Sequence, residues 1–246
     1  MEDLRRLGEE RLGKADLNSG LEYGTIAISK YRRTDGTNSW LVTIPGTDGK
    51  RDSPFGWPQN VELMSSDSKQ RMEADSARMV QEAMKQAGIN SDEPVALIGH
   101  SQGGIVAATI ASDLKDDYDV KHVVTAGSPV ANHPIPDKTW VTSVEMDDEL
   151  VAALDGAPNP NSEHWLTVRG TASKSDNNPK STFAGTPVID APDNKEITHW
   201  LKYHQAAYQN ATDMGSSAMK THEQHFDEIL DGDLQEVMYF EGRMSK

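Results

Sequence analysis

The sequence contains no cysteine and is poor in basic residues. Cysteine is absent from all 246 residues, which excludes disulfide bonds, a thiolate nucleophile and cysteine-based metal sites. Lys and Arg number 24 against 39 Asp and Glu, which gives a formal net charge of −15. Because phosphate binding needs clustered Lys and Arg, this balance argues against a nucleic-acid partner and against electrostatic docking on anionic membranes.

Long apolar runs are missing as well. No run approaches the roughly 20 residues that span a bilayer, so we expect no transmembrane segment. The first 17 residues have no apolar core of the kind that a signal peptide requires. These features indicate a soluble chain, either cytoplasmic or exported by a non-classical route, and they leave the oligomeric state open.

Apolar runs alternate with amphipathic segments along the chain. An Asp-Gly turn at 35–36 between the runs 21–31 and 39–45 predicts an N-terminal hairpin. Further strands are predicted at 94–98, 120–126, 140–146, 164–170 and 237–240, helices at 67–87, 103–114, 198–211 and 216–230, a long loop at 46–66 and a loop or lid at 171–197. We interpret residues 1–20 as a surface helix or connecting arm, followed by one domain over 21–246. The alternation predicts an α/β fold with a mainly parallel sheet flanked by helices.

The segment Gly99-His100-Ser101-Gln102-Gly103 fits the pattern G-x-S-x-G. A nucleophile on a strained turn between a strand and a helix leaves no room for side chains two residues away on either side. Here a predicted buried strand ends at Gly99 and a helix rich in small residues follows. This context predicts that Ser101 is a catalytic nucleophile rather than part of a structural turn.

A second turn, Ile44-Pro45-Gly46-Thr47, ends the strand that precedes the Ser101 segment in the chain. Acyl-transfer sites of this type take one oxyanion donor from a loop after an early strand and another from the residue after the nucleophile. The backbone amides of Thr47 and Gln102 are therefore our candidates for an oxyanion hole.

A serine nucleophile needs a histidine base, and the expected chain order of Ser, acid and His, together with the place of each histidine in the predicted elements, leaves two of the eight histidines as candidates. His199 lies where a loop passes into a predicted helix that Thr198 would cap, whereas His204 lies more than one turn inside that helix. We favour His199 and keep His204 as the alternative. His222 and His225 are predicted to face solvent, and His122 to pack within a strand.

The acid is expected after the second strand beyond the one that carries Ser101. That strand, 140–146, ends in Asp147-Asp148-Glu149, and a cluster of carboxylates there requires a cationic partner. Asp190 and Asp193 are alternative acids within the presumed lid. Spacing alone does not choose among the three clustered carboxylates.

Together, these motifs resemble the α/β-hydrolase superfamily. The segments that carry the resemblance are WLVTIPGT, PVALIGHSQGG, HVVTAGSPVA and VTSVEMDDELVAALDGAPNP, and it extends from about Trp40 to Tyr208. More narrowly, the chain resembles actinobacterial lipase-like serine hydrolases related to class 3 lipases and cutinases. The resemblance implies hydrolysis of carboxylic esters through an acyl-enzyme, with no cofactor and no metal.

The resemblance also favours one of the clustered carboxylates as the acid of the triad. In that family the acid precedes a V-P segment and an L-D-G, which places Glu149 at the acid position with Asp148 as its competitor. The chain departs from the pattern by having Glu for the usual Asp and Ala152 for the Pro. We therefore expect a serine esterase or lipase acting on a small-molecule or lipid ester. The alternatives are a thioesterase or amidase with the same triad, or a non-catalytic binding or toxin-like domain.

Overall fold

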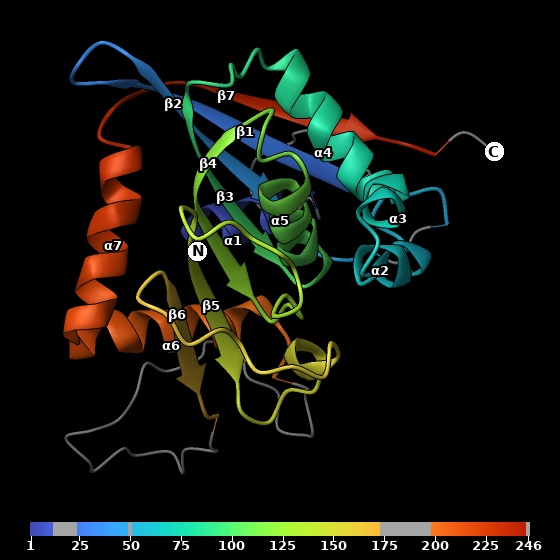
Figure 1. The fold of residues 1–246 in the computed structure, drawn as a ribbon, viewed down its shortest axis with the longest axis vertical. Helices are drawn as coiled ribbons and strands as arrows, with labels where there is room; N and C mark the ends of the chain where they lie inside the picture. The colour runs from blue at the N-terminus through green and yellow to red at the C-terminus, as the bar shows by residue number, and fades with distance from the viewer. Residues whose placement is uncertain (12–23, 49–50, 173–197, 245–246) are drawn as a thin grey trace.

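A seven-stranded sheet runs through the centre of the molecule, with helices on both of its faces (Figure 1). The computed structural model describes residues 1–11, 24–48, 51–172 and 198–244. The strand order is β6-β5-β4-β3-β2-β1-β7. The strands are β1 (Gly24–Arg33), β2 (Asn38–Ile44), β3 (Pro94–His100), β4 (Asp119–Ala126), β5 (Trp140–Met146), β6 (Trp165–Gly170) and β7 (Gly232–Gly242). Strands β2 to β6 are parallel, which confirms the predicted α/β fold with a mainly parallel sheet.

The predicted N-terminal hairpin is formed by β1 and β2, which pair antiparallel. Gly36 has φ +83°, and the Asp35 carboxylate accepts a hydrogen bond from the Thr37 amide at 2.8 Å. A glycine is favoured at this position because other residues are strained at positive φ. β7 pairs with the other side of β1 and runs well beyond the four residues predicted for it.

Two groups of helices cover the two faces of the sheet. The helices are α1 (Glu2–Arg11), α2 (Trp57–Leu63), α3 (Ser68–Glu73), α4 (Asp75–Gln86), α5 (Gln102–Asp113), α6 (Leu201–Met214) and α7 (Ser217–Ile229), with a 3₁₀ turn, η1 (Val151–Ala153). One face is covered by α5 and the layer of α2, α3 and α4 packed on it, and the other by α1, α6 and α7. Within the described ranges, every helix is too short or too polar to cross a membrane.

The first helix, α1, packs on one face of the sheet through its leucines. Leu4 and Leu7 are buried, and Leu4 packs in an apolar cluster with Leu41 and Ile98 of the central strands. The prediction of a helix at the surface is confirmed for residues 2–11, and its leucines at helical spacing cover one face of the sheet. Residues 12–20 lie outside the described residues.

Two further predictions are corrected by tertiary packing. The expected long loop 46–66 contains α2, whose Leu63 is fully buried in the main core. The expected single helix 67–87 is two helices, because Ala74 takes an extended conformation with ψ 127° between α3 and α4. Asp67 caps α3 by accepting a hydrogen bond from the Lys69 amide at 2.8 Å. Of the presumed lid 171–197, residues 173–197 lie outside the described part of the chain.

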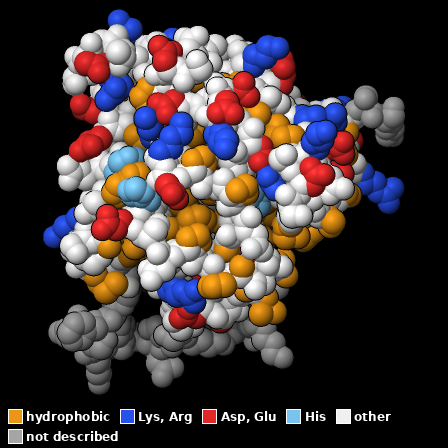
Figure 2. Space-filling model, in the orientation of Figure 1, with side chains coloured by type: hydrophobic (Ala, Val, Ile, Leu, Met, Phe, Trp, Pro, Cys, Tyr) orange, Lys and Arg blue, Asp and Glu red, His pale blue; other side chains and the backbone are white. Residues whose placement is uncertain are grey.

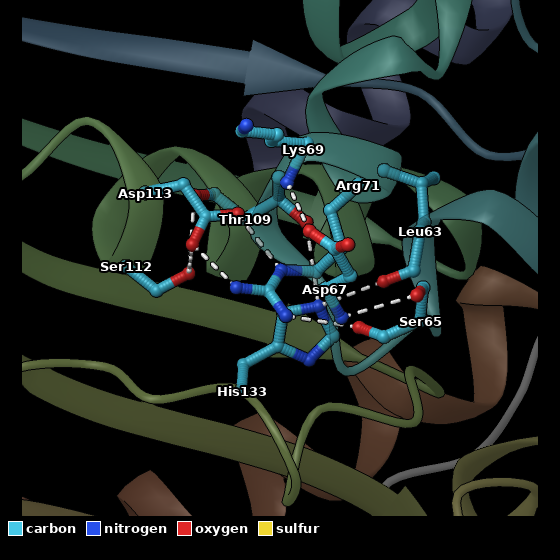
Figure 3. Close-up of polar contacts among 9 residues, drawn as sticks. All are labelled: Leu63, Ser65, Asp67, Lys69, Arg71, Thr109, Ser112, Asp113 and His133. Atoms are coloured by element: carbon cyan, nitrogen blue, oxygen red, sulfur yellow. Dashed lines mark hydrogen bonds and ion pairs between the residues drawn. The ribbon is translucent and has the colours of Figure 1, made fainter.

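A buried ion pair holds α3 against α5 (Figure 3). The Arg71 guanidinium donates to both carboxylate oxygens of Asp113, at 2.8 and 2.5 Å, and to the Ser65 carbonyl at 2.9 Å. Both charged side chains are about as buried as the core, at 3% and 5% exposure. Beside this pair, His133 bonds the Leu63 carbonyl at the end of α2. The network therefore fixes the α2–α3 segment on α5, the helix that begins at the Ser101 turn.

Replacement of Asp113 by Ala is expected to destabilise the fold by about 3–5 kcal/mol, because it leaves the Arg71 charge buried without its carboxylate. Urea unfolding measures this. Arg78→Ala, which breaks an exposed pair with Asp75, is the matched control and should cost less than about 1 kcal/mol. Equal losses in the two variants would contradict a special role for the buried pair.

Candidate active site

Ser101 lies on a strained turn between β3 and α5. Its φ of +54° is the only positive value at a non-glycine residue among the described residues, which is a costly conformation for a residue with a Cβ. The Ser101 amide donates to the Ala126 carbonyl at 2.8 Å, and the Ser128 hydroxyl donates to the Ser101 carbonyl at 2.8 Å. The end of β4 therefore holds both sides of this turn.

The glycines around Ser101 are required by backbone contacts. A Cβ at Gly99 would lie 2.2 Å from the Gly103 carbonyl, and one at Gly103 would lie 2.3 Å from the Ile44 carbonyl. Such distances are far below van der Waals contact. The steric argument made for the G-x-S-x-G motif is thus confirmed, and the second clash shows that the end of β2 packs directly against the start of α5.

The loop after β2 reaches the Ser101 turn, as the oxyanion-hole prediction requires. A Cβ at Gly46 would lie 3.3 Å from the Ser101 Cβ, and the Thr47 hydroxyl accepts a hydrogen bond from Asn60 at 3.3 Å. The buried Gln102 side chain donates to the Gly56 carbonyl at 2.8 Å, just before α2. The two residues predicted to supply oxyanion donors therefore lie on segments that are tied to α2.

Three side chains from distant parts of the sequence form a chain of hydrogen bonds. His199 Nε2 lies 2.9 Å from Ser101 Oγ, and His199 Nδ1 is hydrogen-bonded to Glu149 Oε1. Ser101 follows β3, Glu149 follows β5, and His199 lies just before α6. The carboxyl ends of parallel strands share one edge of the sheet, and this edge is where the three groups meet.

The other candidate acids and the second candidate base occupy different positions. Asp147 and Asp148 are exposed, whereas Glu149 is 5% exposed. Asp147 accepts a hydrogen bond from Thr171. His204 is fully buried and bonds the other oxygen of Glu149, with Nε2 2.7 Å from Oε2. Asp190 and Asp193 lie outside the described residues.

The helix that carries His204 begins later than predicted. α6 begins at Leu201 and its N-cap is Trp200 rather than Thr198. His199 is therefore free of the helix, and His204 lies in the first turn. Both histidines reach one carboxylate because they approach it from a loop and from a helix.

Hydrogen bonding determines the charge of Glu149. Burial alone would raise the pKa of this carboxyl, but the hydrogen bonds from His199 and His204 lower it to about 2. Burial and the nearby charge of His204 lower the pKa of His100 to about 3. A lowered pKa leaves a carboxyl charged but an imidazole uncharged. His100 Nε2 donates to the His199 carbonyl at 2.8 Å. At neutral pH Glu149 is ionised and His100 is neutral.

A second group of histidines lies away from Ser101, and it corrects a prediction. His222 is buried rather than solvent-facing, and it shares the Thr142 hydroxyl with His122 at 3.0 and 2.9 Å. His122 also bonds the half-buried His225, and its ring is buried within β4, so the prediction that His122 packs within a strand is confirmed. Figure 2 shows histidine side chains grouped beside α7. Across the described ranges, no cluster of three or more His, Asp or Glu side chains is arranged to hold a metal ion.

Comparison with known families places this geometry in context. A family model described as a PGAP1-like alpha/beta domain matches residues 60–197, which is more than half of the chain. The chain belongs to this family. The PGAP1-like domain has a hydrolase-type α/β fold, in agreement with the sheet described above. No curated protein matches the chain.

The PGAP1-like match includes Ser101 and Glu149 but ends two residues before His199. The loop with Thr47 precedes it. Sequence reasoning considered His204 only as an alternative base and overlooked its bond to Glu149. The sequence carried one signal for that bond, the separation of five residues between His199 and His204. Two side chains at this separation reach the same carboxylate here because His199 lies outside the helix and His204 lies in its first turn.

Gly127→Ala is expected to abolish most of any activity at this site while leaving the chain folded. Gly127 has φ +58°, and its added Cβ would lie 2.6 Å from Glu149 Oε1 and 3.0 Å from His199 Nδ1. Gly88→Ala is the control, because Gly88 has φ +78° but open space around its Cβ position. Both variants should lose about 1–2 kcal/mol of stability from the positive φ, measured by thermal unfolding. Equal activity in the two variants would contradict the inferred crowding at the carboxylate.

Proposed function

We propose that the protein is a serine hydrolase that cleaves carboxylic esters through an acyl-enzyme on Ser101. The observation that carries this proposal is the position of the His199 ring between the Ser101 hydroxyl and the Glu149 carboxylate. In this arrangement Glu149 fixes the imidazole with a proton on Nδ1, which leaves Nε2 free to accept the serine proton. The membership of the PGAP1-like family, with its hydrolase-type fold, agrees with this function.

The reaction follows from these roles. His199 Nε2 takes the proton from Ser101 Oγ as the oxygen attacks the ester carbonyl carbon. Amides of Thr47 and Gln102 stabilise the resulting oxyanion, each by roughly 3 kcal/mol. His199 then gives the proton to the leaving alkoxide, and the acyl group remains on Ser101. A water molecule, deprotonated by His199, attacks the acyl carbon. His199 then returns the proton to Ser101 Oγ as the bond from this oxygen to the acyl carbon breaks, and the carboxylic acid leaves.

The surroundings of the triad favour an ester with an apolar portion. Trp200 follows His199, Leu150 follows Glu149, and Trp57 begins the helix held by Gln102; all three are more than half exposed. Exposed large apolar side chains near a site are typical of surfaces that bind apolar ligands. This supports a small-molecule or lipid ester as substrate, in line with the resemblance to lipases and cutinases. A net charge of −15 favours an uncharged or cationic ester over an acidic one.

The Ser101→Ala variant should lose hydrolysis of a p-nitrophenyl ester panel and labelling by a fluorophosphonate probe, because the Ser101 hydroxyl is the group that His199 Nε2 contacts. The panel should extend to p-nitrophenyl thioesters and anilides, since faster turnover of these would favour a thioesterase or amidase. Hydrolysis that survives in Ser101→Ala would refute the mechanism. A wild type that neither hydrolyses nor becomes labelled would instead indicate a non-catalytic domain.

Glu149→Gln and Asp148→Asn test the acid with matched changes at adjacent positions. We expect Glu149→Gln to lower kcat/KM by about a thousandfold or more, because a neutral amide no longer enforces the required tautomer of His199. The exposed Asp148 makes its Asn variant the control, with a change of less than about threefold. A larger loss in Asp148→Asn than in Glu149→Gln would transfer the role to Asp148.

A further inference from the structure

The carboxylate of Glu149 has two histidine partners, one on each oxygen. His199 bonds Oε1, and His204 Nε2 lies 2.7 Å from Oε2. The Glu149 and His204 side chains are both fully buried in this contact. A triad of the kind proposed above needs only the first of these bonds, so the buried imidazole of His204 requires a separate explanation.

The partners of His204 determine its protons. Its Nδ1 lies 3.2 Å from the Trp200 carbonyl oxygen, which only accepts hydrogen bonds, so Nδ1 carries a proton. An ionised Glu149 oxygen also only accepts, so Nε2 carries a proton as well. A histidine with protons on both ring nitrogens is an imidazolium cation.

We propose that His204 is a positively charged positioning residue of the site, whose imidazolium holds Glu149 ionised and oriented and opposes a second positive charge on the base His199. This inference rests on the proposed function. His204 does not exchange protons with the substrate. It acts through Glu149.

The other groups around His204 are compatible with one buried ion pair. The His199 ring is 6.2 Å away and the His100 ring 5.7 Å. His100 donates to the His199 carbonyl and is neutral at neutral pH, so it adds no second cation. In the resting site Glu149 is thus the anion and His204 the cation.

Several charged groups on the elements that pack against α6 have partners other than His204. On β6, Arg169 pairs with Glu145 and Asp147 at the end of β5. On α1, Glu2 pairs with Arg5. On α7, Glu223 accepts from Thr212, two turns along α6 from His204. On α6 itself, Lys202 lies over the rings of Trp200 and Tyr203.

The cation has a predictable effect on the pH dependence of hydrolysis. Protonation of His199 removes the base, and it creates a second imidazolium beside the one at His204. Like charges oppose each other, so the cation at His204 opposes this protonation. Removing the charge of His204 should therefore move the acidic limb of the pH–rate profile to higher pH.

His204→Gln tests this with little change in shape, because the amide still has an N–H to donate to Glu149. We expect the acidic limb of kcat/KM for p-nitrophenyl butyrate, measured from about pH 4 to about pH 9, to move up by about one pH unit, while the alkaline plateau stays within about tenfold of wild type. His222→Gln makes the same change at another buried histidine and should leave the limb in place. A uniform loss at every pH in His204→Gln, with an unmoved limb, would overturn the proposal.

Heteronuclear NMR of the histidine rings in the folded Ser101→Ala protein tests the charge without relying on activity. The expected result is that both ring nitrogens of His204 stay protonated at neutral pH and above, whereas His199 has one ring proton there. A single ring proton on His204 at neutral pH would overturn the proposal. Failure of the wild type to hydrolyse esters or to react with the fluorophosphonate would refute the proposed function instead, and the NMR result would still decide the charge of His204.

Discussion

Close backbone packing at the Ser101 turn is the constraint on which the site depends. The turn has room only because Gly99, Gly103 and Gly104 lack side chains. Gly103 packs on the end of β2, and a Cβ at Gly104 would lie 2.1 Å from the Ser128 hydroxyl after β4. The positive φ of Ser101 is held by these contacts and by the bond to the Ala126 carbonyl. Strain of this kind persists only where the surrounding structure over-determines it. These contacts therefore fix the ends of β2, β3 and β4 relative to one another at the candidate nucleophile.

The buried carboxylate of Glu149 is the second constraint, and it follows from the first. Ser101 lies at the edge of the sheet, and His199, the histidine that reaches it, is hydrogen-bonded on its other ring nitrogen by Glu149. An acid in that position is out of water, where an unpaired charge is strongly disfavoured. The glutamate side chain is one methylene longer than that of the usual aspartate, and it presents its two oxygens to two histidines. The departure from the pattern of the lipase-like hydrolases that the sequence resembles is thus accompanied by an additional partner.

Sequence reasoning succeeded where the signals are local. The hairpin depends on Asp35-Gly36, the central strands on short apolar runs, and the Ser101 turn on its glycines; the structure contains all of these. Reasoning failed where packing overrides local preference. The 46–66 segment is rich in residues that favour loops, yet α2 forms within it because Leu63 reaches the core. The burial of His222 likewise depends on neighbours far along the chain, the Thr142 hydroxyl and the Glu163 carbonyl.

The sequence by itself determined the fold class, the position of Ser101 and a short set of candidate acids and bases, because backbone sterics and hydrophobic periodicity act over a few residues. Tertiary structure decided how those candidates are arranged. Asp148 and Glu149 are adjacent in the sequence, but only Glu149 points into the buried edge of the sheet. His199 and His204 were alternatives in the sequence, and folding brings both to one carboxylate, because a loop residue and a first-turn helix residue approach it from different directions. Distances between side chains that are 50 residues apart depend on the packing of the whole sheet, and no local pattern encodes them.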